Sequence, residues 1–285
     1  MKNLKIGFIG SGWIGKNYTL DFKRRGFNIV CYSKDPKYIG NKDLIAKCDI
    51  VFIAVPTPTT PKGFDDGVIR NVLPLIGFGK IAVLKSTILP GTTKKFQEKF
   101  KDIILLYSPE FLSEATAKYD TSKPFSNIVG ISMDMALQRK SAKKVLSILP
   151  KAPFSLICTS TEAEIIKYTH NTSGFVQVIF FNIMYDLAKK FGCDWSVIRK
   201  AIVADPFIPN RYSDPIHKSG RGAGGHCFIK DFEAFKDLYE KILPDDKNSV
   251  SILEGNIKKN IELLLSTKKD VGLLRGVYGD DIINI

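Results

Sequence analysis

Short apolar runs alternate with longer amphipathic stretches along the first part of the chain. Runs of strand length cover residues 4–9, 27–32, 49–55, 81–85 and 103–107, and a helical pattern follows the first run as far as about residue 25. Strands that alternate with helices are typical of a parallel sheet covered by helices on both faces. The pattern therefore predicts a doubly wound α/β domain over residues 1–155.

The spacing of apolar residues changes to a helical period in the second half of the chain. Helices are predicted over residues 162–190, 195–204, 231–242 and 248–266. These helices predict an all-helical central domain over residues 156–268. Residues 269–274 have the apolar run of a strand, so we interpret residues 269–285 as the shortened beginning of a third, α/β domain.

A GxGxxG motif over residues 10–15 separates the first predicted strand from the first predicted helix. In this context the glycines allow a tight turn and let a pyrophosphate approach the backbone at the helix N-terminus. We therefore predict a Rossmann-type fold with a dinucleotide site. The residues assigned to the cofactor on this ground are Gly10, Gly12, Trp13, Ile14 and Gly15.

The end of the second predicted strand bears on which dinucleotide binds. NAD sites usually place an acidic residue there, which binds the ribose hydroxyls. This chain has Ser33 followed by Lys34, and a small polar residue beside a cation can accept the 2′-phosphate of NADP. Asp35, two residues on, is an alternative acidic partner. We assign Ser33 and Lys34 to the cofactor, expect NAD and keep NADP as the alternative.

A glycine-rich segment at residues 222–231 contains a cysteine, Cys227, and a carboxylate, Asp231. If residues 227–231 open a helix, the two side chains share one face. A cysteine at a helix N-terminus tends toward the thiolate, which is the nucleophilic form. The alternative interpretation of this segment alone is a cysteine that only packs in a turn.

Composition and charge limit the classes of function. The 285 residues are 44% hydrophobic, enough for about two domains, and contain no apolar run of about 18 residues. The five scattered cysteines lack metal-type spacing, so we predict no metal site and a reducing, cytoplasmic setting. The net charge of +13 comes mainly from dispersed lysines, which favours a solvated surface over a nucleic-acid or membrane partner. Such a field attracts an anionic small substrate.

Several segments together give the chain a family resemblance. Besides residues 10–15 and 222–231 they are residues 55–58, 85–93, 108–117 and 163–171. With them the chain resembles the UDP-glucose/GDP-mannose dehydrogenase family over residues 4–275. The resemblance implies an N-terminal Rossmann domain, a central helical domain that forms a homodimer, and a C-terminal nucleotide-binding domain, which would begin about where this chain ends.

The resemblance also implies an activity with named residues. The family oxidises the C6 primary alcohol of a nucleotide sugar, here expected to be a UDP-sugar, with two NAD and a cysteine thioester. Cys227 matches the nucleophile and Glu110 the general base, and Thr87 holds the water. Lys167 and Asn171 match an oxyanion-stabilising pair, with Asp231 nearby.

Further contacts are implied by the same matching segments. The additional cofactor residues are Val55, Pro56, Thr57, Ser86, Thr87, Glu114 and Lys230. The expected substrate residues are Glu110, Phe111, Leu112, Lys167, Asn171, Arg211, Lys218, Gly222 and Gly224. For Arg211 and Lys218 a plain surface charge is an equal alternative. His226 departs from the residue usual before the cysteine of the UDP-glucose enzymes, so the sugar stays open.

Two other functions remain as alternatives. A two-electron β-hydroxyacid dehydrogenase shares the Rossmann-plus-helical plan, and a helical lysine with a nearby asparagine, but needs no cysteine. A catalytically idle dinucleotide-binding homologue would need neither the cysteine nor the polar set around it.

Overall fold

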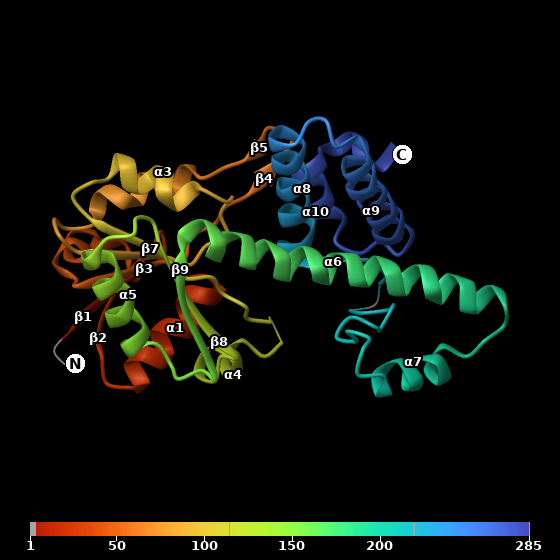
Figure 1. Cartoon of the computed structure of the whole chain (residues 1–285), viewed down its shortest axis with the longest axis horizontal. Coiled ribbons are helices and arrows are strands. Elements are labelled where there is room, and N and C mark those ends of the chain that lie inside the picture. The colour runs from red at the N-terminus through yellow and green to blue at the C-terminus, as the bar shows by residue number, and fades with distance from the viewer. Residues whose placement is uncertain (1–3, 114, 219, 285) are drawn as a thin grey trace. The chain divides into compact units, whose positions relative to one another are not determined.

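A computed structural model describes residues 4–284, apart from residues 114 and 219. The chain forms two compact units. The first comprises the residues up to Thr57 together with Asp65–Lys167, and the second comprises Pro58–Phe64 and Tyr168–Ile285. The division falls within one long helix, α6 (Ser160–Lys190), whose residues 160–167 belong to the first unit (Figure 1).

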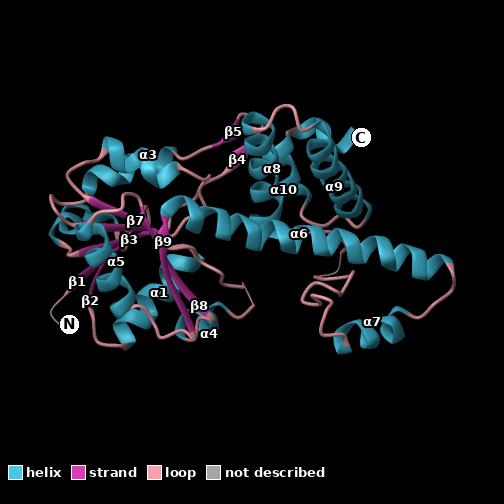
Figure 2. Ribbon diagram, viewed as in Figure 1, coloured by secondary structure: helices cyan, strands magenta, loops and turns pink. Residues whose placement is uncertain are grey.

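The first unit is built on a seven-stranded sheet in the order β2-β1-β3-β6-β7-β8-β9. Its strands are drawn in magenta in Figure 2. Its strands are β1 (Lys5–Ile9), β2 (Asn28–Tyr32), β3 (Ile50–Ile53), β6 (Ile81–Leu84), β7 (Ile104–Tyr107), β8 (Ser126–Ile131) and β9 (Phe154–Thr159). Neighbouring strands pair in parallel, except that β7 and β8 are antiparallel. The predicted parallel sheet is confirmed from β2 to β7, and two strands that the sequence pattern did not predict extend it in the opposite direction.

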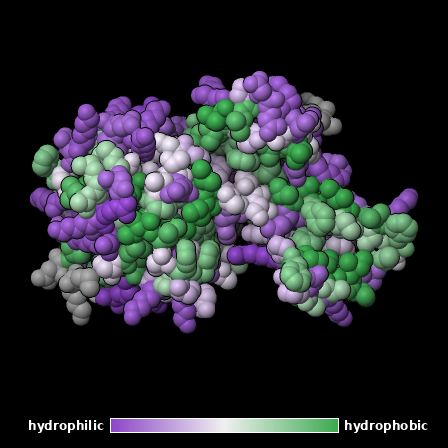
Figure 3. Space-filling model, in the orientation of Figure 1, coloured by the Kyte–Doolittle hydropathy of each residue, from purple (hydrophilic) through white to green (hydrophobic). Residues whose placement is uncertain are grey.

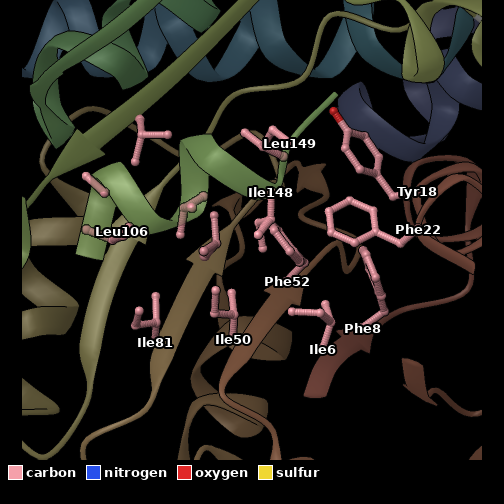
Figure 4. Packing of buried hydrophobic residues seen from close by; sticks show 14 of the residues in the cluster. Ile6, Phe8, Tyr18, Phe22, Ile50, Phe52, Ile81, Leu106, Ile148 and Leu149 are labelled. Atoms are coloured by element: carbon pink, nitrogen blue, oxygen red, sulfur yellow. The ribbon is translucent and has the colours of Figure 1, made fainter. Parts of the chain in front are cut away.

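Aromatic side chains fill the space between this sheet and its helices. Phe8 on β1 stacks on Phe52 on β3 with ring centroids 5.2 Å apart, and Phe22 meets both rings edge-on (Figure 4). Tyr18 lies at the margin of this cluster, and its hydroxyl points out of it. The helices of the unit are α1 (Trp13–Arg24), η1 (Ile39–Lys47), α2 (Gly67–Val72), η2 (Leu73–Leu75), α3 (Thr92–Lys99), α4 (Ala117–Ser122) and α5 (Ala136–Ile148).

The strand order reverses at β1, and this reversal indicates where a ligand would bind. Strand β2 pairs with one edge of β1 and β3 with the other. In open α/β sheets ligands bind outside the carboxyl ends of the strands at such a point. Here those ends lead into the glycine motif after Ile9 and into the proline-rich loop after Ile53.

The second unit is helical, as predicted. Besides most of α6 it contains α7 (Trp195–Ala204), α8 (Gly225–Ile242), α9 (Lys247–Ser266), α10 (Val271–Tyr278) and η3 (Asp280–Asn284), with a small hairpin, β4 (Thr59–Thr60) and β5 (Gly63–Phe64). Phe175 on α6 stacks on Phe232 on α8 with centroids 4.0 Å apart, at the centre of its core. None of the helices in the described ranges is both long and apolar enough to cross a membrane.

The strand predicted over residues 269–274 is wrong, because these residues lead into helix α10. Leu274 and Val277 lie three residues apart and are buried in the same cluster as Leu264 of α9. That spacing puts both side chains on one helical face, whereas in a strand they would point to opposite faces. Helix α8 also begins six residues before its predicted start at Asp231, at Gly225.

Candidate active site

The glycine motif has the geometry of a dinucleotide loop. Gly10 has φ +100°, and a Cβ there would stand 2.2 Å from the Ala54 carbonyl oxygen. A Cβ on Gly15 would stand 2.0 Å from the Gly10 carbonyl oxygen, whereas nothing lies within 4 Å of the corresponding point on Gly12. Helix α1 begins directly after Gly12 with no side-chain cap, so its first N–H groups are available to an anion. The predicted role of the motif fits this geometry.

The loops after β3 and β6 are fastened to each other by hydroxyl groups. The Ser86 hydroxyl donates to the Val55 carbonyl oxygen at 2.7 Å and accepts from the Val55 N–H at 3.0 Å. The Thr57 hydroxyl donates to the Thr87 carbonyl oxygen at 2.7 Å. The buried hydroxyls of Ser86 and Thr57, which the sequence assigned to the cofactor, therefore hold the two strand ends in register.

The proposed base, Glu110, lies in a buried cluster of polar groups within the first unit. Its Oε1 accepts the Phe111 N–H at 2.9 Å, and its Oε2 is 3.2 Å from Nζ of Lys85, the residue after β6. The two side chains are 8% and 2% exposed. The Lys85 ammonium also donates to the Ser108 carbonyl oxygen at 3.2 Å and lies 4.5 Å from the centre of the Tyr18 ring.

Burial and charge change the titration of this cluster. Burial lowers the pKa of Lys85, and the carboxylate of Glu110 partly opposes that effect. Burial also raises the pKa of Tyr18, and the charge of Glu110 adds to it. Sequence reasoning assigned no role to Lys85 or Tyr18. The position of Lys85 directly after a fully apolar strand could have indicated that this lysine is buried.

Glu164 fastens α6 to the start of α3 within the same unit. Its Oε1 accepts the N–H and the hydroxyl of Thr93 at 2.8 and 2.6 Å, and its Oε2 accepts the Gly91 N–H at 2.5 Å. Burial is the main effect and raises the pKa of this carboxyl group to about 7, while these three hydrogen bonds act in the lowering direction. Lys167 follows on the same helix and is buried, with Nζ 5.4 Å from the centre of the Phe111 ring.

The second unit joins three of its predicted site residues directly. Asn171 on α6 donates from Nδ2 to Oδ2 of Asp231 on α8 at 2.6 Å, and both side chains are buried. Lys230 donates from Nζ to the other oxygen of Asp231, and the Lys230 carbonyl oxygen accepts the Thr59 hydroxyl at 2.9 Å. Asp231 therefore orients the Asn171 amide and is itself held by a neighbouring cation.

Cys227 is exposed in the first turn of α8, four residues before Asp231. The backbone N–H groups of a first helical turn stabilise negative charge, which suits a sulfur nucleophile. Tyr212 packs edge-on against the next residue, Phe228, at 5.5 Å between ring centroids. The structure therefore confirms that residues 227–231 are helical. Cys227 and Asp231, four residues apart, lie on one face of α8 for this reason.

A buried residue of α9, Asn260, and a half-buried residue just before α10, Asp270, hold the loop before Cys227. Asn260 accepts the Ala223 N–H at 2.7 Å and donates to the Ala223 carbonyl oxygen at 3.1 Å, while Asp270 accepts the Gly225 N–H at 2.7 Å. A Cβ on Gly224 would stand 2.0 Å from Oδ2 of Asp270. A Cβ on Gly222 would stand 3.0 Å from Asn260 Oδ1. Both glycines, predicted to contact substrate, are thus needed for this packing.

The remaining predicted site residues are spread over both units. Arg211 is exposed and lines a pocket of about 510 Å³, together with His170, Gln177 and Tyr212. Lys218 is exposed at a turn with φ +51° and does not line this pocket. Leu112 is half-buried at the edge of the first unit's core. Glu114 lies outside the described residues.

Comparisons with known proteins agree with this arrangement. The NAD-binding domain of the UDP-glucose/GDP-mannose dehydrogenase family matches residues 40–147, and its central domain matches residues 161–258. A UDP-glucose 6-dehydrogenase of Campylobacter jejuni is 31% identical over 244 residues, which are 83% of this chain and 60% of that protein. One of Streptococcus pneumoniae is 28% identical over 210 residues, 71% of this chain and 52% of that protein.

A solved structure has the same fold. The UDP-glucose dehydrogenase of Pyrobaculum islandicum superimposes with a TM-score of 0.77 at 23% identity, covering 92% of this chain and 71% of that one. The chain spans less than two thirds of the length of the Campylobacter and Streptococcus relatives. With both family domains matched in order, the chain belongs to the UDP-glucose/GDP-mannose dehydrogenase family.

Proposed function

We propose that this chain uses a nicotinamide dinucleotide, NAD or NADP, to oxidise the C6 primary alcohol of a UDP-sugar to a carboxylate, through a thioester on Cys227. The observation that carries the proposal is the first part of α8. There Cys227 is exposed, and Asp231, one turn further on, is bonded to Asn171. The names of the Campylobacter and Streptococcus relatives support a UDP-sugar as substrate.

The cysteine divides a four-electron oxidation into separate steps. When bound, the dinucleotide would accept the hydride in each of the two oxidations. Cys227 Sγ adds to the carbonyl carbon of the aldehyde to give a thiohemiacetal, and loss of a hydride from that carbon gives the thioester. Water then releases the acid and restores the thiol, so one sugar, two dinucleotides and one water give one carboxylate, two reduced dinucleotides and three protons. A thiol stays reduced in the cytoplasm, where we propose the protein acts.

The other polar residues suit the charges that develop in these steps. Lys167 and Asn171 lie four residues apart on α6, so their side chains share a face, and an ammonium with an amide donor stabilises an oxyanion. Asp231 fixes the Asn171 amide through its 2.6 Å hydrogen bond. Glu110 takes the proton of the attacking water, and Lys85 balances its charge in the buried cluster.

The stoichiometry of the reaction tests the proposal. The protein is mixed with UDP- and GDP-sugars and with NAD or NADP, and reduced dinucleotide and acid are counted per sugar consumed. We expect two reduced dinucleotides and one acid for at least one UDP-sugar. One reduced dinucleotide with no acid would indicate a two-electron hydroxyacid-type reaction instead. No reduction with any sugar, despite dinucleotide binding, would indicate an idle binding protein.

We also propose a homodimer through the helical unit. An exposed apolar stripe follows one face of α6, with members three or four residues apart: Val176, Phe180, Ile183 and Leu187. Exposed Phe191, directly after the helix, continues it. Hydrophobic surface gathers over this part of α6 and over α7 (Figure 3). A second copy of the chain would cover it. Sedimentation should give a dimer for the wild type and a monomer for Phe180→Glu, and a monomeric wild type would contradict the proposal.

A further inference from the structure

The register of β1 and β2 fixes which residue follows the second strand at the dinucleotide crevice. Tyr32, the last residue of β2, pairs with Ile9, the last residue of β1, so Ser33 and Gly10 leave the sheet side by side. The Gly10 N–H donates to the Tyr32 carbonyl oxygen at 2.9 Å, and the Ser11 hydroxyl donates to the Ser33 hydroxyl at 3.0 Å. Ser33 therefore stands against the glycine loop, where the adenosine ribose of a dinucleotide binds.

No carboxylate stands at that position. The nearest one in sequence, Asp35, accepts the Lys37 N–H at 2.9 Å through Oδ1, while its own N–H donates to the Ser33 hydroxyl at 3.2 Å. These two bonds form a local turn that Asp35 itself closes. An acidic side chain at the end of β2 would bind the 2′-hydroxyl of NAD and repel the 2′-phosphate of NADP. Serine does neither.

Positive charge surrounds the same corner of the first unit. Lys34 follows Ser33 and is exposed, and residues 33–47 contain four lysines against two aspartates. The Asn41 side chain donates to the Cys31 carbonyl oxygen at 2.9 Å, which fastens the start of η1 to β2. The Ser33 hydroxyl accepts the Ser11 hydroxyl and the Asp35 N–H, so its own hydrogen and the Lys34 ammonium can donate hydrogen bonds to a phosphate and balance its charge.

We propose that Ser11, Ser33 and Lys34 form a subsite for the 2′-phosphate, so that the chain binds NADP in preference to NAD. The inference rests on the proposed function only in needing a dinucleotide at the glycine loop. It names the cofactor that the same reaction would use.

Binding measured without turnover tests this inference. Calorimetric titration of the wild-type protein with NADP and with NAD gives two dissociation constants. NADP should bind about tenfold more tightly or better, the size of effect expected for charge-assisted hydrogen bonds to a phosphate. Equal or tighter binding of NAD would overturn the inference and leave the proposed function standing. Binding of neither dinucleotide would overturn both.

Variants test which residues determine the preference for NADP over NAD. Ser33→Asp should reverse it, because a carboxylate gains the ribose hydroxyls of NAD and repels the phosphate. Lys34→Gln should weaken NADP binding several-fold with no change for NAD. Lys140→Gln on α5 removes the same charge from an exposed helix outside the loop and should change neither constant. An unchanged NADP-to-NAD ratio in Ser33→Asp, or an equal loss in Lys34→Gln and Lys140→Gln, would overturn the assignment.

Discussion

The two units hold their reactive groups in opposite ways. In the first unit the charged groups themselves are buried, with Lys85 and Glu110 at 2% and 8% exposure and 3.2 Å between Nζ and Oε2. In the second unit the proposed nucleophile Cys227 is exposed, and Asn260, which holds its loop, is buried. The first framework controls the charge of a side chain, whereas the second controls the position of a backbone. Variants in the two units should therefore fail differently.

The largest effect is expected at the exposed thiol. Cys227→Ser should lower acid formation by about 1000-fold or more, because a serine hydroxyl is a far weaker nucleophile than a thiol, while the unfolding free energy stays near that of the wild type. Cys193→Ser, at another exposed cysteine, should keep wild-type turnover. Unchanged acid formation in Cys227→Ser would contradict the chemical role of Cys227.

The buried pair should respond mainly through stability. Lys85→Met should cost about 3–5 kcal/mol in the unfolding free energy measured with urea, because Glu110 would keep a buried charge without its cation. The double variant Lys85→Met with Glu110→Gln should recover most of that loss, since no unbalanced charge remains. Additive losses in the double variant would show that the ion pair is not what holds this cluster together.

A smaller effect is expected from the residue that holds the cysteine loop. Asn260→Ala leaves both backbone groups of Ala223 without their side-chain partner and should cost about 2–3 kcal/mol. It should also change the rate at which iodoacetamide alkylates Cys227. Asn256→Ala on the same helix, where the half-buried side chain donates to the Ile252 carbonyl oxygen one turn back, is the matched control. If the two variants had the same unfolding free energy and the same alkylation rate of Cys227, Asn260 would not position the loop.

Glu164 should give an effect no larger than that of Asn260, and it should be visible only as a pH dependence. Because its pKa is raised from 4.5 to about 7, the folded state binds the proton more tightly than the unfolded chain. Its contribution to stability is then complete below about pH 4.5 and is lost as the pH rises through about 7. The free energy of unfolding, measured with urea, should fall between pH 4.5 and 8, and this fall should be about 2–3 kcal/mol smaller in Glu164→Gln than in the wild type.

The neighbouring Glu162 provides the control for that experiment. The N–H and hydroxyl of Thr159 lower its pKa, so its contribution is lost as the pH falls below the unfolded value. Glu162→Gln should therefore alter only the acid side of the stability curve. Identical pH curves for the two variants would contradict the assignment of the raised pKa to burial of Glu164.

Local patterns predicted the parts of the fold that local physics decides. The bounds of α7 coincide with the predicted helix over residues 195–204, because apolar spacing and the capping side chain of Asp194 agree there. The glycine motif was readable because its turn needs glycine at Gly10 and Gly15 whatever surrounds the loop. Strand β1 and helix α1 follow from the same segment.

Features that depend on distant residues could not be predicted in this way. Six apolar-rich residues at 269–274 fit either a strand or a helix, and burial of Leu274 against α9 decides between them. The early start of α8 depends on Asp270, which accepts the Gly225 N–H across 45 residues of sequence. The partners of Glu110 and Ala223 are likewise set by packing. The sequence thus indicated the candidate reactive residues, but not the residues that position them.

The most direct measurement looks for the thioester itself. With Glu110→Gln, the proposed base for hydrolysis is gone, so the acyl intermediate should accumulate when a substrate UDP-sugar and the dinucleotide are supplied. Acid quenching, digestion and mass spectrometry should then find the sugar-nucleotide acyl group on the peptide that contains Cys227. Acid production by the wild type with no adduct in the variant, or an adduct on Cys193 instead, would contradict the account.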